Sequence, residues 1–117
     1  MNEIIIEHFR NPHNAGNLVE ATATVEATNP ACGDTMRLSV RLEGERIVEA
    51  RFKMQGCVAS IAAGSALTDL LIGHSLAESR QITPAKISEA LGGLPPTTMH
   101  AAELAMDALT ILLRQVQ

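Results

Sequence analysis

The chain has 117 residues, of which 46% are hydrophobic, and a formal net charge of -4. This length suits one domain with its own core and is too short for two ordinary domains, so we expect a single domain over residues 1–117. The nine Lys and Arg residues are scattered singly, which argues against a nucleic-acid-binding surface. No apolar run approaches the roughly 18 residues of a membrane span, and the N-terminus lacks the features of a signal peptide, so we expect a cytoplasmic protein without a membrane partner.

The predicted core is aliphatic, because Phe9 and Phe52 are the only aromatic residues. The two cysteines, Cys32 and Cys57, could form one disulfide. A reducing compartment and a sizeable aliphatic core favour thiol or metal chemistry instead.

The first predicted element is a short helix between Asn2 and Pro12. Asn2 can cap its start, and Pro12 ends it by restricting the preceding residue. Its apolar residues recur at spacings of three and four, namely Ile5, Ile6 and Phe9. Residues 11–17 follow as a turn.

Three segments then alternate between apolar and polar residues, which indicates strands with one buried face. They cover residues 21–27, 36–42 and 48–54. The inner face of the third is predicted to consist of Val48, Ala50, Phe52 and Met54. A turn containing Gly44 joins the second strand to the third, so we expect an antiparallel meander.

Helices follow the strands. The first runs over residues 57–72, is rich in small residues, and ends at Gly73. Ser75 and Glu78 have the spacing of a capping box and predict a short helix. Thr83 and Pro84 offer an N-cap and a first-turn proline for a helix over 86–91, which Gly92 and Gly93 close.

Pro95 and Pro96 predict an extended approach to a last helix over 98–116. The apolar stripe of this helix consists of Ala102, Ala105, Met106, Leu109, Leu112, Leu113 and Val116. Strands followed by helices are typical of the α+β class. We therefore predict two layers, a three-stranded antiparallel sheet packed against helices on one face.

The junction between the third strand and the next helix is the most informative stretch. Gly56 ends the alternation and permits a sharp change of backbone direction, which leaves Cys57 at the start of the helix. Backbone N–H groups and the helix dipole stabilise a thiolate there and lower the thiol pKa. The alternative is a small buried structural cysteine.

Cys32, Asp34 and His100 also lie in loops or at element ends. If the junctions converge, the four side chains supply two thiolates, a carboxylate and an imidazole, which suit zinc or an iron-sulfur unit. Gly33 would let the loop bend so that its neighbours face one centre. Asp34 could instead only cap a turn, and His100 could be a surface histidine. The remaining histidines have no partner pattern and are expected to be solvated, namely His8, His13 and His74.

Four segments together resemble the U-type iron-sulfur cluster assembly scaffold family, which comprises the IscU proteins and the NifU N-terminal domain. They are HFRNPHNAG (8–16), PACGD (30–34), RFKMQGCVASIAAGS (51–65) and LPPTTMHA (94–101). The resemblance covers essentially the whole chain and implies the α+β sandwich of that family.

The resemblance also implies a site, since four family site residues match Cys32, Asp34, Cys57 and His100. Family members accept sulfur from a cysteine desulfurase, collect iron, build a [2Fe-2S] cluster and pass it to cluster-accepting proteins. Their apo forms commonly hold zinc. The aspartate is thought to keep the cluster exchangeable, since oxygen binds iron less firmly than thiolate does.

The chain departs from the family at two positions. The family has a third cysteine, a main persulfide acceptor, directly after the histidine, where this chain has Ala101. This change argues against normal de novo cluster assembly, because alanine offers neither a thiolate ligand nor a sulfur nucleophile. Thr98 stands where related scaffolds carry the lysine of LPPVK, which speaks against recognition by their dedicated Hsp70-type chaperone. The insertion of the zinc-dependent SufU branch is absent.

Three hypotheses follow. The leading one is a divergent scaffold or carrier whose four remaining ligands bind iron, a [2Fe-2S] cluster or zinc. The second is a zinc-stabilised interaction module that docks on a cysteine desulfurase without carrying a cluster. The third is an otherwise competent scaffold in which Ala101 is an engineered replacement of cysteine. An enzyme is the least favoured reading, because the sequence shows no nucleophile, base and orienting residue beyond the ligands.

Overall fold

The computed structural model describes residues 1–31 and 33–116. Its sheet has three antiparallel strands in the order β1 (Ala23–Thr28), β2 (Thr35–Glu43) and β3 (Arg46–Gln55). The predicted meander is confirmed. In the register, Leu38 pairs with Val25 on one side and with Phe52 on the other, and all three side chains are buried.

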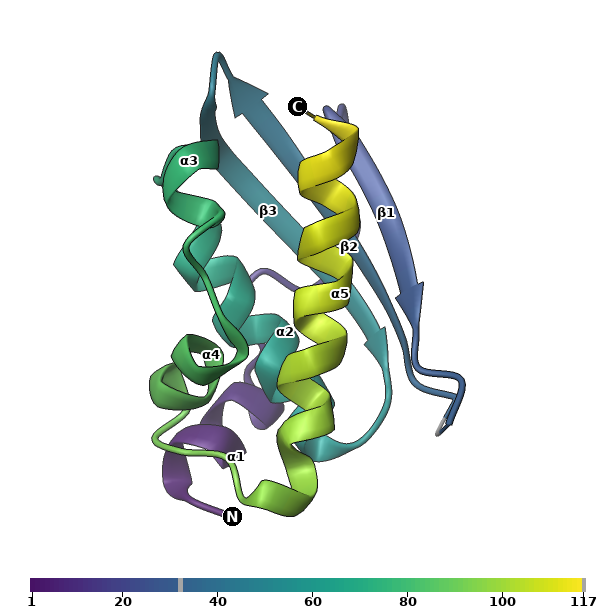
Figure 1. The fold of residues 1–117 in the computed structure, drawn as a ribbon, viewed down its shortest axis with the longest axis vertical. Coiled ribbons are helices and arrows are strands. Elements are labelled where there is room, and N and C mark those ends of the chain that lie inside the picture. Colours follow the sequence, from purple (N-terminus) through teal and green to yellow (C-terminus); the bar gives the residue numbers. More distant parts are fainter. Residues whose placement is uncertain (32, 117) are drawn as a thin grey trace.

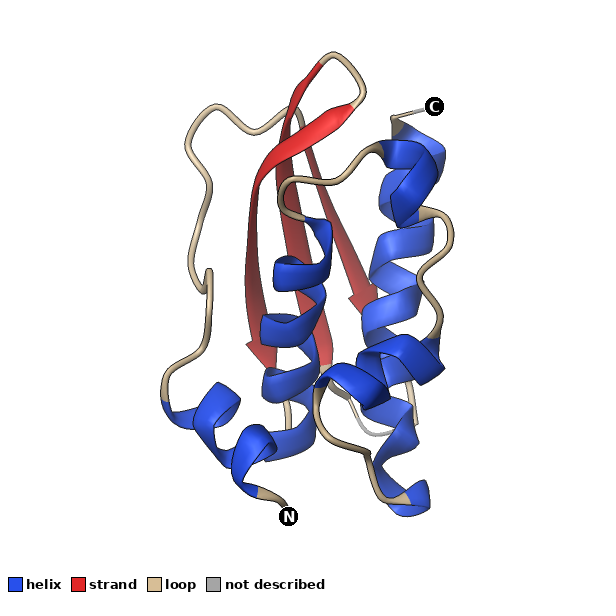
Figure 2. Ribbon diagram, turned by 90° about the vertical axis from the view of Figure 1, so that its left-hand side faces the viewer, coloured by secondary structure: helices blue, strands red, loops and turns tan. Residues whose placement is uncertain are grey.

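The helices lie together on one face of the sheet, as Figures 1 and 2 show. In chain order they are α1 (Glu3–Arg10), α2 (Val58–Leu71), α3 (Leu76–Ser79), α4 (Pro84–Ala90), the 3-10 helix η1 (Pro96–Thr98) and α5 (Met99–Gln115). The helix α2 packs on β3, while α5 packs on β1, β2 and α2. This arrangement confirms the predicted two-layer α+β class. Among the described residues, no helix combines the length and the hydropathy that crossing a bilayer requires.

The alternation of β3 differs from the prediction near its start. Arg41 pairs with Glu49, but the next residue of β2, Leu42, pairs with Ile47, so the register shifts between them. The extra residue is Val48, and such a bulge reverses which side chains face the core. Consequently Ile47 is fully buried, whereas Val48, which we predicted on the inner face, is only half-buried.

The central helix α2 lies very close to β3. A Cβ atom placed on Gly64 would stand 2.6 Å from the Phe52 ring, which is closer than carbon atoms pack. The absence of a side chain at Gly64 therefore allows the Phe52 ring to pack against the backbone of the helix. Ten of the 14 residues of α2 are buried, so this helix is the centre of the helical layer.

The N-terminal helix α1 begins as predicted, since the Asn2 side chain accepts a hydrogen bond from the Ile5 N–H at 2.9 Å. Only part of the apolar set at helical spacing, Ile5, Ile6 and Phe9, faces the core. Ile5 and His8 are buried, whereas Phe9 is 38% exposed. The expectation that His8 is solvated was therefore wrong. Burial lowers the pKa of His8, and the neighbouring His13 acts in the same direction, so the imidazole is neutral at pH 7.

The C-terminal elements follow their local signals. Ser75 and Glu78 form the predicted capping box, and Thr83 caps α4, which begins at Pro84 rather than at residue 86. The approach to α5 differs from the prediction: Pro95 is extended, but Pro96 begins the 3-10 helix η1. Proline suits the first turn of a helix, because its missing N–H would have no partner there.

Candidate metal centre

Cys57 is the N-cap of α2, directly after the end of β3 and Gly56. Its extended backbone (φ -76°, ψ 174°) is the usual conformation at this position. The thiol is exposed, so the prediction of a helix-start cysteine is confirmed and the buried structural alternative is wrong. The Sγ atom lies 3.3 Å from the Ser60 hydroxyl.

The pKa of the Cys57 thiol lies below its usual value. Partial desolvation acts in the opposite direction and raises this pKa, but several hydrogen bonds outweigh it. They come from the side chain and backbone of Ser60, from His100 and from the backbone of Ala59. A thiolate at the start of α2 is therefore stabilised, and a thiolate is the form that attacks electrophiles and binds metals.

Gly56 is needed for space rather than for a turn. Its φ is not among the positive values found at other glycines. A Cβ atom at this position would lie 2.8 Å from Asp34 Oδ2 and 2.9 Å from its Cγ. The glycine therefore allows the Asp34 carboxylate to approach the start of α2, which corrects the predicted role in changing the backbone direction.

Asp34 is half-buried and directly precedes β2. The Ser60 hydroxyl donates a hydrogen bond to its Oδ2 at 2.9 Å, so the carboxylate faces α2. Gly33 has a φ of 76°, a left-handed conformation that glycine adopts readily, so the loop bends at this residue. The side chain that caps the turn is that of Asn29, which accepts from the Ala31 N–H at 3.0 Å.

His100 is the second residue of α5 and is half-buried. Its Nε2 lies 3.9 Å from the Cys57 Sγ. One ligand atom from each of Asp34, Cys57 and His100 lies within 4.8 Å of the other two. The predicted convergence is thus observed for three of the four candidate ligands. The fourth, Cys32, lies outside the described residues.

Ser60 was missed by the sequence analysis. It is fully buried and lies between the two ligands, with hydrogen-bond contacts to Cys57 Sγ and to Asp34 Oδ2. The available signal was its position three residues after the N-cap, one helical turn along α2, which places it beside the cap.

Ala101 follows His100 but faces a different way. Successive residues of a helix point about 100° apart, and Ala101 is fully buried whereas His100 is half-buried. Its methyl group is part of the core between α5 and its neighbours. The residue that follows His100 in the chain is therefore a buried apolar one.

A thiolate, an imidazole and a carboxylate whose ligand atoms lie within 4.8 Å of one another are suited to zinc and to iron. Magnesium and calcium prefer oxygen ligands throughout. Tetrahedral zinc and each iron of a [2Fe-2S] unit need four ligands, counting bridging sulfide in the cluster. The three described residues supply most of such a set.

Known proteins resemble the chain over nearly its full length. A family model described as NifU-like N terminal domain matches residues 1–116. The chain is 39% identical over 105 residues to "Iron-sulfur cluster assembly scaffold protein IscU 1" of Archaeoglobus fulgidus, covering 90% of this chain and 69% of that protein. It is 49% identical over 107 residues to "Bifunctional protein NifU/MnmA" of Rubrobacter xylanophilus. There the match covers 90% of this chain but only 22% of the relative.

A solved structure shares the same fold. It is the N-terminal part of a nitrogen-fixing NifU-like protein from Brucella abortus, with a TM-score of 0.80 and 19% sequence identity. The superposition covers 98% of this chain and 92% of that one. The architecture of sheet and helices is therefore that of known NifU-like domains.

Proposed function

Because the chain belongs to the NifU-like N-terminal domain family, we propose that it is an iron-sulfur cluster assembly scaffold or carrier. The proposed cargo is iron or a [2Fe-2S] cluster, with zinc in the cluster-free protein. The proposed ligands are Cys32, Asp34, Cys57 and His100. The naming of the Archaeoglobus relative as such a scaffold supports this assignment.

The convergence of three chemically different ligands carries the proposal. Asp34, Cys57 and His100 come from the start of β2, the start of α2 and the first turn of α5, yet their ligand atoms lie within 4.8 Å of one another. A rigid sheet and two packed helices hold them. Because the three ligands are already held close together, they can bind one ion or cluster with little rearrangement.

The ligands have different proposed roles. The Cys57 thiolate, stabilised by hydrogen bonds, binds the incoming metal firmly, while the Asp34 carboxylate is a harder and more exchangeable ligand. The exposure of Cys57 leaves the bound cargo open to a delivering or accepting protein. The work of this protein is then binding and transfer, without turnover of a substrate. We propose a cysteine desulfurase and cluster-accepting proteins as partners, and Thr98 makes the Hsp70-type chaperone an unsuitable one.

Ala101 limits the proposed chemistry. Its buried methyl group supplies no thiolate, so four ligands remain for the cargo. Two thiolates, one carboxylate and one imidazole still complete the coordination of a tetrahedral zinc ion or of a [2Fe-2S] unit.

The test is the content of iron, zinc and acid-labile sulfide in protein purified without oxygen. We expect iron and sulfide in equal amounts, or zinc, in the unmodified protein, and loss of the iron and sulfide, or of one equivalent of the zinc, in Cys57→Ser. The control is His74→Gln, which replaces an exposed histidine outside the centre and leaves the metal content unchanged. Equal metal and sulfide in Cys57→Ser and the unmodified protein would overturn the proposal.

A further variant separates a cluster carrier from a zinc-binding interaction module. If the unmodified protein contains zinc alone, and iron with sulfide appears only in Ala101→Cys, the chain has kept the fold and lost cluster assembly. Iron and sulfide in the unmodified protein show that the four remaining ligands suffice.

A further inference from the structure

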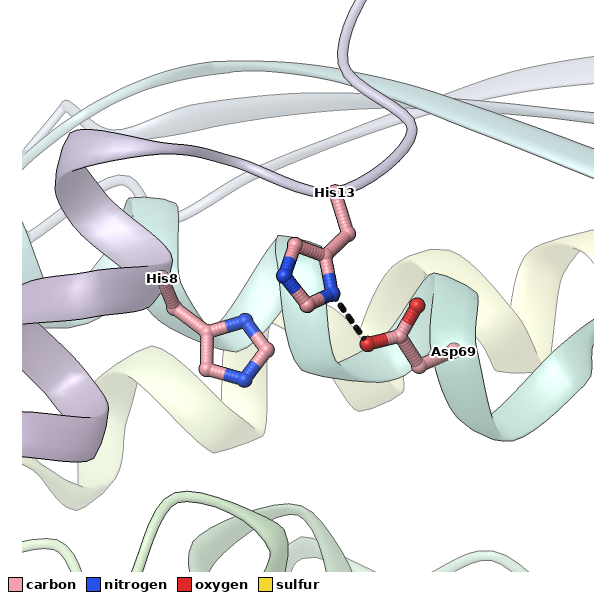
Figure 3. Close-up of side chains that lie close together, drawn as sticks. All are labelled: His8, His13 and Asp69. Atoms are coloured by element: carbon pink, nitrogen blue, oxygen red, sulfur yellow. Dashed lines mark hydrogen bonds and ion pairs between the residues drawn. The ribbon is translucent and has the colours of Figure 1, made fainter.

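A second cluster of potential metal-ligating side chains lies towards the C-terminal end of α2. His8 comes from α1, His13 from the loop that follows, and Asp69 from the last turn of α2. Figure 3 shows that the two imidazole rings and the Asp69 carboxylate lie close together, with His13 in contact with Asp69. One ligand atom from each lies within 4.8 Å of the other two, which corrects the expectation that the two histidines have no partners.

The contacts within the cluster are short. His13 Nδ1 lies 2.6 Å from Asp69 Oδ2, and the ring centroids of His8 and His13 are 4.6 Å apart. His8 is 9% exposed, whereas His13 and Asp69 are exposed to solvent. The cluster is therefore built on a buried imidazole and is open on its outer side, where an ion and its water ligands can enter.

Neighbouring side chains orient the three residues. Ser65 Oγ lies 2.7 Å from His8 Nδ1 and accepts the His13 backbone N–H at 2.8 Å. With Nδ1 engaged by Ser65, Nε2 is the His8 nitrogen left for another partner. Asn14 donates to Asp69 Oδ1 at 3.3 Å, which leaves Oδ2 directed at His13. Hydrogen bonds of this kind, made by the second nitrogen or oxygen of the side chain, orient the ligands of protein metal sites.

The loop that carries His13 is fixed to the edge of the sheet. The Gly16 N–H donates to the Phe52 carbonyl at 2.8 Å, and the Phe52 N–H donates to the Asn14 carbonyl at 3.0 Å. Asn14 itself has a φ of 61°. These backbone hydrogen bonds hold the loop and thus fix the position of His13 relative to α2. The cluster is therefore already assembled before an ion binds.

We propose that His8, His13 and Asp69 bind a first-row divalent transition metal ion such as Zn²⁺ or Fe²⁺. Two imidazoles and one carboxylate on one side of an ion, with open positions on the other, are a known ligand set for such ions and contain too few oxygens for magnesium or calcium. Ligand atoms around tetrahedral zinc lie about 3.4 Å apart, as follows from bonds of about 2.1 Å. Binding of both atoms to one ion would widen the 2.6 Å separation of His13 Nδ1 and Asp69 Oδ2 and bring the more distant ligand atoms, which lie within 4.8 Å, closer together.

The proposed site is separate from the Cys57 centre and does not rest on the proposed scaffold function. Asp69 follows Cys57 by twelve residues, which is about 18 Å along a helix that rises 1.5 Å per residue. No residue is shared between the two sets of ligands. The two sites also differ in chemistry, since the His8, His13 and Asp69 set contains no sulfur.

The first test titrates Zn²⁺ by calorimetry into a Cys32→Ser, Cys57→Ser protein, in which the thiol ligands are absent. We expect one equivalent to bind. Adding His13→Gln or Asp69→Asn lowers the affinity by more than about 100-fold, because loss of a ligand exceeds the 10–100-fold effect of losing an outer hydrogen-bond partner. The matched control is His74→Gln, an exposed histidine outside the cluster, which leaves the affinity unchanged. No binding in this background, or equal affinity in all variants, overturns the proposal.

A second measurement uses the unmodified protein, so that the result does not depend on how the cysteine variants fold. Imidazole ¹⁵N shifts are recorded as Zn²⁺ is added beyond the first equivalent. We expect the His8 and His13 nitrogens to shift while those of His74 do not. Unchanged His8 and His13 signals, or equal shifts at all three histidines, contradict the site.

Discussion

Ser60→Ala is the most informative single substitution in the Cys57 centre. Ser60 is fully buried and donates to Asp34 Oδ2 at 2.9 Å. A hydrogen bond to a charged group contributes about 1.5–3 kcal/mol. Since Asp34 is half-buried and water can replace part of this bond, we expect the free energy of unfolding to fall by about 1–2 kcal/mol.

The assay is urea unfolding in the presence of EDTA, arranged as a double-mutant cycle with Asp34→Ala. If the bond to Asp34 carries the effect, Ser60→Ala costs clearly less in the Asp34→Ala background than in the unmodified protein. Equal costs in both backgrounds would refute the reasoning, because the serine would then stabilise the fold through packing alone.

The same variant tests the electrostatics of Cys57. The Ser60 hydroxyl is the first of the hydrogen-bond partners that lower the pKa of this thiol. Its one proton is shared between the thiolate and Asp34 Oδ2, and Ser60→Ala removes it, so the pKa of the thiol rises and the thiolate fraction at pH 7 falls. We expect the pH profile of Cys57 alkylation by iodoacetamide, measured with Cys32→Ser, to move to higher pH in Ser60→Ala. An unmoved profile would show that the serine does not stabilise the thiolate.

Three further predictions concern the fold. Gly64→Ala places a Cβ atom 2.6 Å from the Phe52 ring and lowers stability by about 1–3 kcal/mol, as overpacking does; an unchanged urea midpoint would contradict the close packing. Asn2→Ala removes the cap of α1 and lowers the free energy of unfolding by about 1 kcal/mol, measured by the same urea unfolding. If this decrease were no larger than that caused by Asn17→Ala, it would count against the cap. Hydrogen bonds from Ser75 hold the pKa of Glu78 below its usual value, so its contribution to stability is present above the unfolded pKa and disappears as pH falls through the lowered folded pKa. Glu78→Gln is therefore destabilising at pH 7 but not at about pH 2, and an equal effect at both values would refute the linkage.

Local signals explain why most elements could be predicted from the sequence. Alternation over 36–42 marks β2, and the Ser75–Glu78 and Thr83–Pro84 pairs mark the starts of α3 and α4. Each signal depends on residues within one turn or one strand, which the sequence displays directly.

Features that depend on distant partners could not be predicted in the same way. The bulge at Val48 arises from how β3 pairs with β2. The burial of His8 depends on Ser65, 57 residues away, and no spacing rule connects the two. Gly56 was noticed, but the reason for glycine there is the approach of Asp34, which is a tertiary contact.

The candidate metal centre contains both features that local signals predict and features that depend on distant partners. The start of α2 at Cys57 could be predicted from the change in periodicity, and the convergence of Asp34 and His100 from the layer arrangement. Ser60 could not be singled out, because a serine in a helix rich in small residues carries no distinctive pattern. Its contacts with both candidate ligands become evident only when β2 and α2 are placed together.

X-ray absorption at the zinc edge, on protein loaded with less than one equivalent of Zn²⁺, tests the central claim most directly. We predict sulfur in the coordination shell together with nitrogen or oxygen, and loss of one sulfur in Cys57→Ser, because Cys57 belongs to the site with Asp34 and His100. A shell of nitrogen and oxygen alone, unchanged in Cys57→Ser, would contradict the account.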